Sequence, residues 1–238
     1  VAFDPDNNTV QAKLQLEKAG AQLVEVAAPL QPLRARKNPA ELAVMKEAFR
    51  EADLVVEGAI AWACDEVEAG ERVTEASFAE EVTRRFHEAG AVGLSFRVIS
   101  AAGENGAHIH YGSPSKRRAL EAGELVLLDT GAYFEEGYAT DLTRTFLVGG
   151  KAQAATDEQR RIYTTVLKAA IAGMKAVVPV GAKGHQLDAI VRAPLWAEGL
   201  DYSHGTGHGV GINVHEFPPR IGPSSASTLE VGHVFSIE

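Results

Sequence analysis

The sequence predicts a mixed α/β fold made of two similar halves. Each half consists of a long helical segment, a glycine break, a shorter helix, and then a strand region that contains histidine. The repeated positions are the tripeptide Ala-Ile-Ala at residues 59–61 and 170–172, Val67 with Val178, and Gly70 with Gly181. Matches this few are also compatible with chance. A true duplication would relate the halves by pseudo-twofold symmetry and place a site between them.

Four helices are predicted from apolar periodicity and from capping residues. Asn38 suits an N-cap, Pro39 suits the first helical position, and Glu41 lies three residues after the cap. Thr156 and Gln159 form a second pair of this kind. The expected helices cover residues 38–69, 74–89, 156–178 and 184–199.

Strands are expected between the helices and near the N-terminus. The candidate strands are residues 1–4, 22–27, 95–101, 108–111, 124–130 and 138–148, followed by short strands and loops after residue 202. A short helix is expected at 11–19, and Pro29 and Pro32 are expected to interrupt regular structure. The basic clusters at 34–37 and 116–118 are interpreted as solvated turns.

The domain prediction divides the chain at residue 37. Residues 1–37 are too short to form a domain alone, so we interpret them as the end of an N-terminal domain and its linker. Residues 38–238 form the expected catalytic domain. The chain begins with Val1 and stops directly after the apolar run V-F-S-I, so both ends are expected to be cut, the catalytic domain at its C-terminus.

Composition excludes several classes of protein. Hydrophobic residues make up 45% and charged residues 23% of the chain, which is typical of a folded globular protein. The net charge of -9 argues against nucleic acid as a partner. No apolar run reaches the roughly 18 residues of a membrane helix. The single cysteine, Cys64, excludes an internal disulfide and fits a cytoplasmic location.

Two aspartates are the first candidates for chemistry. Asp129 ends the apolar run L-V-L-L-D-T-G, and Asp141 lies in G-Y-A-T-D-L-T-R-T-F. A turn between the two expected strands can bring both carboxylates to one side. Two close carboxylates repel each other unless a proton or a cation lies between them. The alternative is that Asp141 pairs with Arg144 at the surface while Asp129 is a turn residue.

A histidine cluster follows in H-G-T-G-H-G-V-G-I-N-V-H-E. His204, His208 and His215 lie within twelve residues, in a chain that has eight histidines. Neutral imidazole is a common metal ligand and also carries protons near neutral pH. The interleaved glycines allow backbone and side chains to crowd one site. A purely structural role is the alternative interpretation of this cluster.

Three further candidates lie outside these motifs. His108 and His110, in A-H-I-H-Y-G, would face the same way on a strand, unless they are surface residues. Glu238 ends an apolar strand, as Asp129 does. The sequence therefore predicts acids at the ends of two buried strands.

The motifs together resemble the pita-bread metallopeptidases, which include aminopeptidase P, prolidase and methionine aminopeptidase. Four blocks carry the resemblance: H-I-H-Y-G, L-L-D-T-G…A-T-D-L-T-R-T-F, H-G-T-G-H-G-V-G-I-N-V-H-E and V-F-S-I-E. It covers about residues 38–238, and the T-D-L-T-R-T and V-H-E blocks are most similar to the proline-specific branch. The resemblance implies the pita-bread fold, with duplicated α-β halves preceded by the tail of a truncated N-terminal domain.

The resemblance also implies the site. Its metal ligands would be Asp129, Asp141, His208 and Glu238, and its catalytic residues His110, His204, His215 and Glu238. The pair of divalent ions would be manganese, with cobalt or zinc as the other candidates. A fifth ligand, a second glutamate, would lie beyond the end of the chain. The spacing between the two aspartates is one residue longer than expected, with the extra residue placed in the turn at 134–137.

The implied activity is hydrolysis of the Xaa-Pro bond, at the N-terminus of peptides or in dipeptides, by a metal-bridging hydroxide. The implied partners are proline-containing peptides and a second copy of the chain in a homodimer. The sequence does not separate an aminopeptidase from a dipeptidase. The rival interpretations are an inactive pita-bread binding module and a metal-free hydrolase of the creatinase type.

Overall fold

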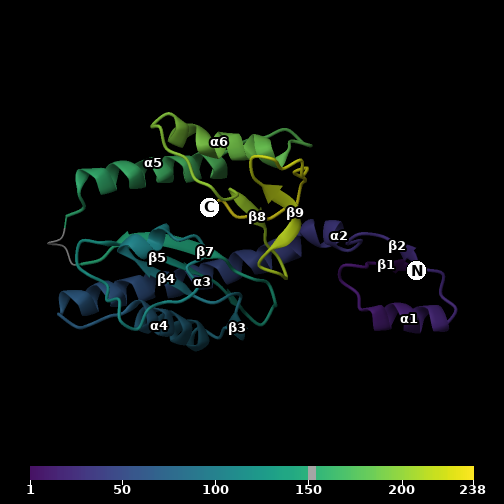
Figure 1. The fold of residues 1–238 in the computed structure, drawn as a ribbon, viewed down its shortest axis with the longest axis horizontal. Coiled ribbons are helices and arrows are strands. Elements are labelled where there is room, and N and C mark those ends of the chain that lie inside the picture. The colour runs from purple at the N-terminus through teal and green to yellow at the C-terminus, as the bar shows by residue number, and fades with distance from the viewer. Residues whose placement is uncertain (150–153) are drawn as a thin grey trace.

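The first half of the chain is a three-stranded antiparallel sheet backed by two helices, as Figure 1 shows for the computed structural model, which describes residues 1–149 and 154–238. The helices are α3 (Pro39–Glu68) and α4 (Glu75–Glu88). The sheet has the order β4 (Ile99–Ala102), β5 (Leu125–Thr130), β7 (Leu142–Leu147). The predicted cap of the long helix is confirmed, because the Asn38 side chain accepts hydrogen bonds from the backbone N–H groups of Ala40 and Glu41.

The alternation along β5 decides which side chains enter the core. Val126 and Leu128 are fully buried and pack with α3 and α4 residues such as Val56 and Phe78. Successive residues of a strand point to opposite faces, so Asp129 lies on the face turned away from these helices. The predicted strand therefore presents its terminal carboxylate away from the first hydrophobic core.

The second half repeats the arrangement with a smaller sheet. Its helices are α5 (Asp157–Met174) and α6 (Gly184–Trp196), and its strands are β8 (Gly207–Gly209) and β9 (Glu216–Ile221). The capping box of Thr156 and Gln159 is confirmed. Gly184 must be glycine, because a Cβ there would lie 2.0 Å from the Arg220 carbonyl oxygen of β9. The start of α6 therefore packs directly on the backbone of β9.

The two halves face each other with the C-terminus between them, and the first 37 residues lie to one side (Figure 1). That N-terminal segment contains β1 (Ala2–Phe3), α1 (Val10–Lys18), β2 (Val24–Glu25) and α2 (Gln31–Ala35), with β1 and β2 paired in parallel. Helix α2 contacts β9 of the second half. Among the described residues, no helix is long and apolar enough to cross a membrane.

Several local predictions are wrong. Pro32 does not interrupt structure but lies in the first turn of α2, where its missing N–H costs nothing. The third helix ends at Met174, so Val178 is not the helical counterpart of Val67.

Residues 108–111 were expected as a strand, but they form a loop after the short 3-10 helix η1 (Gly103–Ala107). The strand expected at 95–101 is shifted, because β3 (Gly93–Leu94) pairs with β6 (Ala132–Tyr133) and β4 begins only at Ile99. Asp141 directly precedes β7 instead of lying within the strand.

Candidate metal centre and active site

Three predicted ligands meet between the two halves of the molecule. His208 Nε2 lies 3.0 Å from Glu238 Oε1 and 3.4 Å from Asp141 Oδ2. One ligand atom from each of the three residues falls within 4.8 Å of the others. Asp141 precedes β7, His208 lies on β8 and Glu238 is the last residue. Because these positions are far apart in the sequence, only the tertiary fold brings them together.

Strand pairing explains how each ligand reaches the site. Asp129 pairs with Thr143 across β5 and β7, and the Thr143 hydroxyl donates a 3.0 Å hydrogen bond to Asp129 Oδ1. This register places Asp129 beside Asp141 at the same sheet end. On the other side, Ser236 N donates to His208 O, and Glu238 N donates to Thr206 O. The final residues therefore run alongside β8 and bring Glu238 next to His208.

The alternative role of Asp141 as a surface partner of Arg144 is wrong. Arg144 pairs instead with Asp53 on α3, at 2.7 Å. Asp141 is only partly exposed and turns toward His208.

The His208 ring is oriented by its own backbone neighbour. Its Nδ1 lies 2.9 Å from the Gly209 carbonyl oxygen, which can only accept a hydrogen bond. Nδ1 therefore carries a hydrogen, and Nε2 is the atom that faces the carboxylates. A histidine that donates one ring N–H to a carbonyl and presents the other nitrogen is the usual form of a metal ligand.

Burial and mutual contact shift the pKa values of the acids and of His208 in this site. Burial raises the pKa of Asp129, and the neighbouring Asp141 raises it further, to about 7. Burial lowers the pKa of His208, but hydrogen bonds to Asp141 and Glu238 outweigh this and raise it to about 10. Burial also opposes ionisation of Glu238, yet the hydrogen bonds from His208 and Ser236 lower its pKa.

This donor set fits divalent cations. Three carboxylates and one imidazole converge here, and oxygen-rich sites with a histidine suit hard or borderline divalent metals. A cation in this position would offset both the burial and the repulsion from Asp141 that raise the pKa of Asp129.

The other predicted histidines surround this centre. The His215 ring lies 4.1 Å from that of His208. Burial lowers the pKa of His215, and the nearby His208 and, more weakly, His110 lower it further. His204 stacks beside Tyr202, with ring centroids 4.7 Å apart. His108 is exposed on the same loop as His110.

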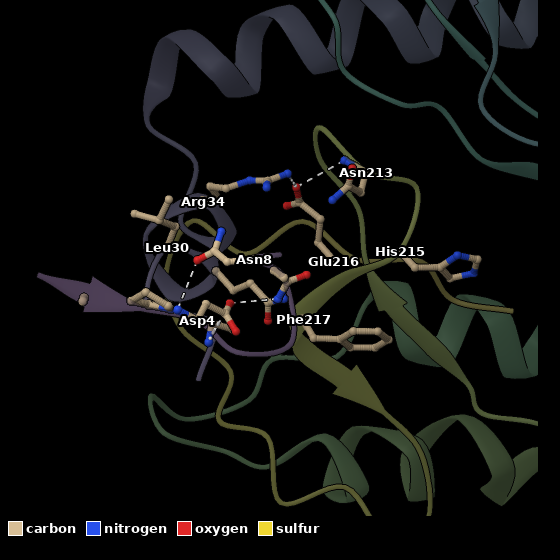
Figure 2. Close-up of a pocket in the computed structure, with 13 residues that line it drawn as sticks. Asp4, Asn8, Leu30, Arg34, Asn213, His215, Glu216 and Phe217 are labelled. Carbon is tan, nitrogen blue, oxygen red and sulfur yellow. Dashed lines mark hydrogen bonds and ion pairs between the residues drawn. The ribbon is translucent and has the colours of Figure 1, made fainter. Parts of the chain in front are cut away.

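A cavity of about 430 Å³ opens beside His215, between the N-terminal segment and the second half (Figure 2). Asp4, Leu30 and Arg34 line it from one side and Phe217 from the other. The cavity shows that the N-terminal segment approaches the loop that carries His215.

The basic cluster at 34–37 was predicted to be solvated, and this is wrong. Lys37 is buried and its ammonium lies 2.9 Å from Glu216 Oε2, while Arg34 Nη2 lies 2.8 Å from Glu216 Oε1. Glu216 directly follows His215 in the chain. Because its partners are about 180 residues away, no local sequence signal points to this cluster.

Two buried charged residues near the site were also missed. Glu75 begins α4 and accepts four hydrogen bonds from the loop that carries His110. Arg192 of α6 binds the loop that carries His204. A signal existed for the second, because Asp188 and Arg192 form an acid–base pair four residues apart within the apolar face of a helix.

Comparison with known proteins places these features in context. The family described as "Metallopeptidase family M24" matches residues 44–238. The chain is 39% identical over 242 residues to a "Probable Xaa-Pro aminopeptidase P" of Neurospora crassa, which covers 98% of this chain and 34% of that protein. The chain thus spans about a third of the length of this curated relative.

Solved structures of Xaa-Pro peptidases have a similar fold. A Xaa-Pro dipeptidase from Bacillus anthracis has a TM-score of 0.86 at 30% identity, over 100% of this chain and 63% of that one. An X-prolyl aminopeptidase from Caenorhabditis elegans, described as a cytosolic enzyme with a di-nuclear active site, has a TM-score of 0.82 at 33% identity. That match covers 91% of this chain and 35% of the worm chain.

Proposed function

Because this chain belongs to metallopeptidase family M24, we propose that it forms the catalytic centre of an enzyme that hydrolyses Xaa-Pro peptide bonds. The family is metal-dependent, and the predicted pita-bread fold is confirmed by the structural likeness. The observation that carries the proposal is the convergence of Asp141, His208 and Glu238, with Asp129 beside them.

We propose that Asp129, Asp141, His208 and Glu238 hold two divalent cations, with manganese as the expected metal. The expected fifth ligand, a second glutamate, would lie beyond residue 238. When bound, such a pair of cations lowers the pKa of a water molecule so that it can attack the peptide carbonyl.

The chain's own residues would supply the proton transfer and the charge stabilisation. Glu238 lies at the edge of the site, where its carboxylate can accept a proton from water and pass it to the leaving nitrogen. His110, His204 and His215 surround the centre and would donate hydrogen bonds to the substrate carbonyl as negative charge develops on its oxygen. One well-placed donor of this kind lowers the activation barrier by about 3–4 kcal/mol.

The test uses the complete protein that contains this chain. We expect it to hydrolyse a Xaa-Pro peptide, to leave the matched Xaa-Ala peptide uncut, and to lose activity when a chelator removes metal. Rates on Xaa-Pro and Xaa-Pro-Yaa substrates then separate a dipeptidase from an aminopeptidase. A metal-replete protein that binds the peptide without cleaving it would support the inactive binding module instead, and activity that survives metal removal would support the creatinase-type hydrolase.

The ligand assignment has its own test. His208→Ala should abolish stoichiometric metal binding, because it removes the nitrogen that faces both carboxylates. His87→Ala is the matched control, since His87 is exposed on α4. Metal analysis of the two variants that gives equal contents would refute the assignment.

Three further predictions accompany this function. We propose a cytoplasmic location, which the single cysteine and the C. elegans structure, described as a cytosolic enzyme, support. A homodimer and the division of the chain at residue 37 stay predictions. Size measurement of the complete protein in solution tests the dimer.

A further inference from the structure

We propose that Arg192 is a positioning residue that fixes His204 in the active site. The inference deepens the proposed function and rests on it, because His204 matters only if this centre carries out hydrolysis. Arg192 belongs to α6 and does not reach the candidate ligands. Its effect would pass through the backbone of the segment from residue 201 to residue 206.

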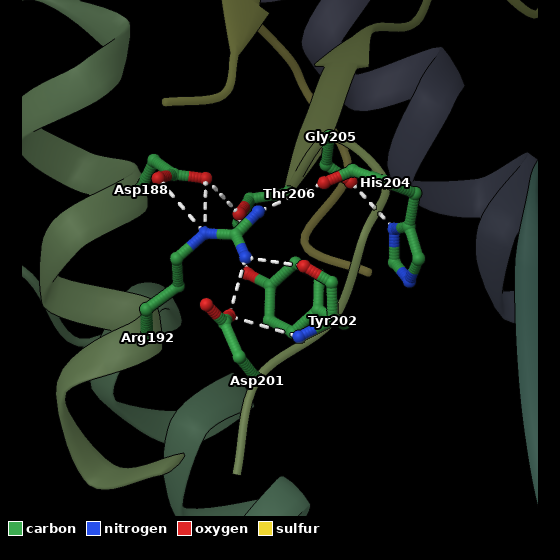
Figure 3. A network of polar contacts seen from close by, with 7 residues as sticks. All are labelled: Asp188, Arg192, Asp201, Tyr202, His204, Gly205 and Thr206. Atoms are coloured by element: carbon green, nitrogen blue, oxygen red, sulfur yellow. Dashed lines mark hydrogen bonds and ion pairs between the residues drawn. The ribbon is translucent and has the colours of Figure 1, made fainter. Parts of the chain in front are cut away.

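The guanidinium of Arg192 is almost completely buried, and each of its three nitrogens donates at least one hydrogen bond. Its Nε donates to both oxygens of Asp188, at 3.1 and 3.0 Å. Its Nη1 donates to Asp201 Oδ1 and to the Tyr202 carbonyl oxygen, each at 2.6 Å, and its Nη2 donates to the His204 carbonyl oxygen at 2.8 Å. Figure 3 shows these bonds converging on one planar group.

Two of those bonds hold the loop backbone on either side of residue 203. A buried carbonyl needs a donor, and here one rigid group serves both Tyr202 and His204. The guanidinium also lies over the Tyr202 ring, 3.8 Å from its centroid. Since the Tyr202 ring in turn packs against the His204 ring, Arg192 constrains both the backbone and the side-chain stacking of His204.

The network closes through Thr206. The Thr206 hydroxyl donates to Asp188 Oδ1 at 2.5 Å and also pairs with the Tyr202 hydroxyl. Thr206 is fully buried, and its carbonyl oxygen accepts from the Glu238 backbone N–H. The segment is therefore fixed at its start by Arg192 and at its end by Asp188 and by the chain that carries Glu238.

This fixation determines which His204 nitrogen faces the site. His204 Nδ1 lies 2.7 Å from the Gly205 carbonyl oxygen, so Nδ1 carries a hydrogen and Nε2 is the nitrogen left for the substrate, to which it donates a hydrogen bond only as part of the imidazolium cation. Catalytic donors lose effectiveness when they move by about 1 Å. A lysine at position 192 would keep the charge beside Asp188, but it lacks the planar fork that reaches two carbonyl oxygens at once.

The experiment is a double-mutant cycle in the complete, metal-loaded protein. The four proteins are the wild type, Arg192→Lys, His204→Ala and the double variant, each assayed for kcat and KM on a Xaa-Pro peptide. If Arg192 acts through His204, Arg192→Lys lowers kcat about tenfold in the wild-type background, but less than about twofold when His204 is already absent. Arg161→Lys on α5 is the control, because that exposed arginine pairs only with surface glutamates among the described residues.

An equal loss in both backgrounds would overturn the proposal, because it would mean that Arg192 acts through general stability. A second readout is independent of activity: the Nδ1–H signal of the His204 ring, assigned by its absence in His204→Ala. The chemical shift of this signal should change in Arg192→Lys, while the ring signals of His87 on the surface of α4 should not. An unchanged His204 shift would also overturn the proposal.

The two proposals fail in different ways. A wild-type protein that does not cleave Xaa-Pro peptides refutes the proposed function, and the ring signals then decide the role of Arg192. If Arg192→Lys does not fold, Tyr202→Leu replaces it in both measurements, because it removes the ring that joins the guanidinium to His204. The same non-additive loss of kcat and the same shift of the ring signal are expected from that variant.

Discussion

Replacing Glu75 by glutamine should loosen the loop that carries His110. Glu75 is fully buried at the first position of α4. Its Oε1 accepts from Ala102 N at 2.8 Å and Asn105 Nδ2 at 2.9 Å, and its Oε2 accepts from the Tyr111 hydroxyl and Ser115 N, each at 2.9 Å. One carboxylate therefore ties together the start, middle and end of the loop from 102 to 115.

The size of the effect follows from these four bonds. In either orientation of the glutamine amide, one buried backbone N–H, that of Ala102 or of Ser115, faces the amide nitrogen and loses its acceptor, which costs about 1–3 kcal/mol. The remaining hydrogen bonds become weaker, because their acceptor is no longer a charged carboxylate. The free energy of unfolding should fall by about 3 kcal/mol in total, a large share of a typical stability of about 5–15 kcal/mol.

The loop also holds backbone strain that Glu75 supports. His110 has a φ of 56°, a left-handed conformation that costs a non-glycine residue about 1–3 kcal/mol and persists only where the surroundings enforce it. When the anchor weakens, His110 should relax toward ordinary backbone angles and leave the neighbourhood of His215. We therefore expect kcat on a Xaa-Pro peptide to fall about tenfold.

Urea unfolding and steady-state kinetics measure the two effects. Glu80→Gln is the matched control, because Glu80 lies on the same helix and is exposed. If the two variants unfold at the same urea concentration, the anchoring role of Glu75 is refuted. If Glu75→Gln is destabilised but keeps its full kcat, the loop anchor is confirmed and its link to His110 is refuted.

Other expectations concern the metal centre and its support. Metal affinity should rise about tenfold per pH unit from about pH 7 to pH 9, because a cation must displace the proton that His208 holds with a pKa of about 10. The dependence on pH should be steeper below about pH 7, because Asp129, with a pKa of about 7, also gains a proton there. Calorimetric titrations that give a pH-independent affinity would contradict this. Lys37→Met should lower the free energy of unfolding by about 1–3 kcal/mol, since it removes the partner of the buried Glu216 Oε2 while Arg34 and the Asn213 N–H still bind Oε1, and an unchanged thermal midpoint would refute it. His215→Ala should reduce turnover while metal content stays intact, and full activity would remove this ring from the mechanism.

Local chemistry allowed much of the fold to be predicted from sequence. The caps of the long helices depend on residues three positions apart, so Asn38 with Glu41 and Thr156 with Gln159 could be recognised without tertiary information. The strand that ends in Asp129 is likewise an uninterrupted apolar run. For the helix caps the stabilising partners are neighbours in the chain, and for the strand the apolar run is itself the signal, although its pairing partners β4 and β7 lie elsewhere in the sequence.

The sequence also indicated which residue types could hold a metal, because carboxylates at strand ends and a glycine-rich histidine cluster are unusual in a core. The motif resemblance supplied the family, and the comparisons confirmed it. Of the predicted ligands, the structure brings Asp141, His208 and Glu238 into one group and sets Asp129 beside them.

Only the tertiary structure decided how the site is held. Lys37 meets Glu216 across 179 residues, and Glu75 binds a loop 27 to 40 residues away. His110 takes a left-handed backbone that alternation along a strand could not predict. A buried charge is stable only where distant donors or acceptors satisfy it, and those partners are chosen by the packing of whole elements. The candidate ligands are thus set by the sequence, and their anchors by the fold.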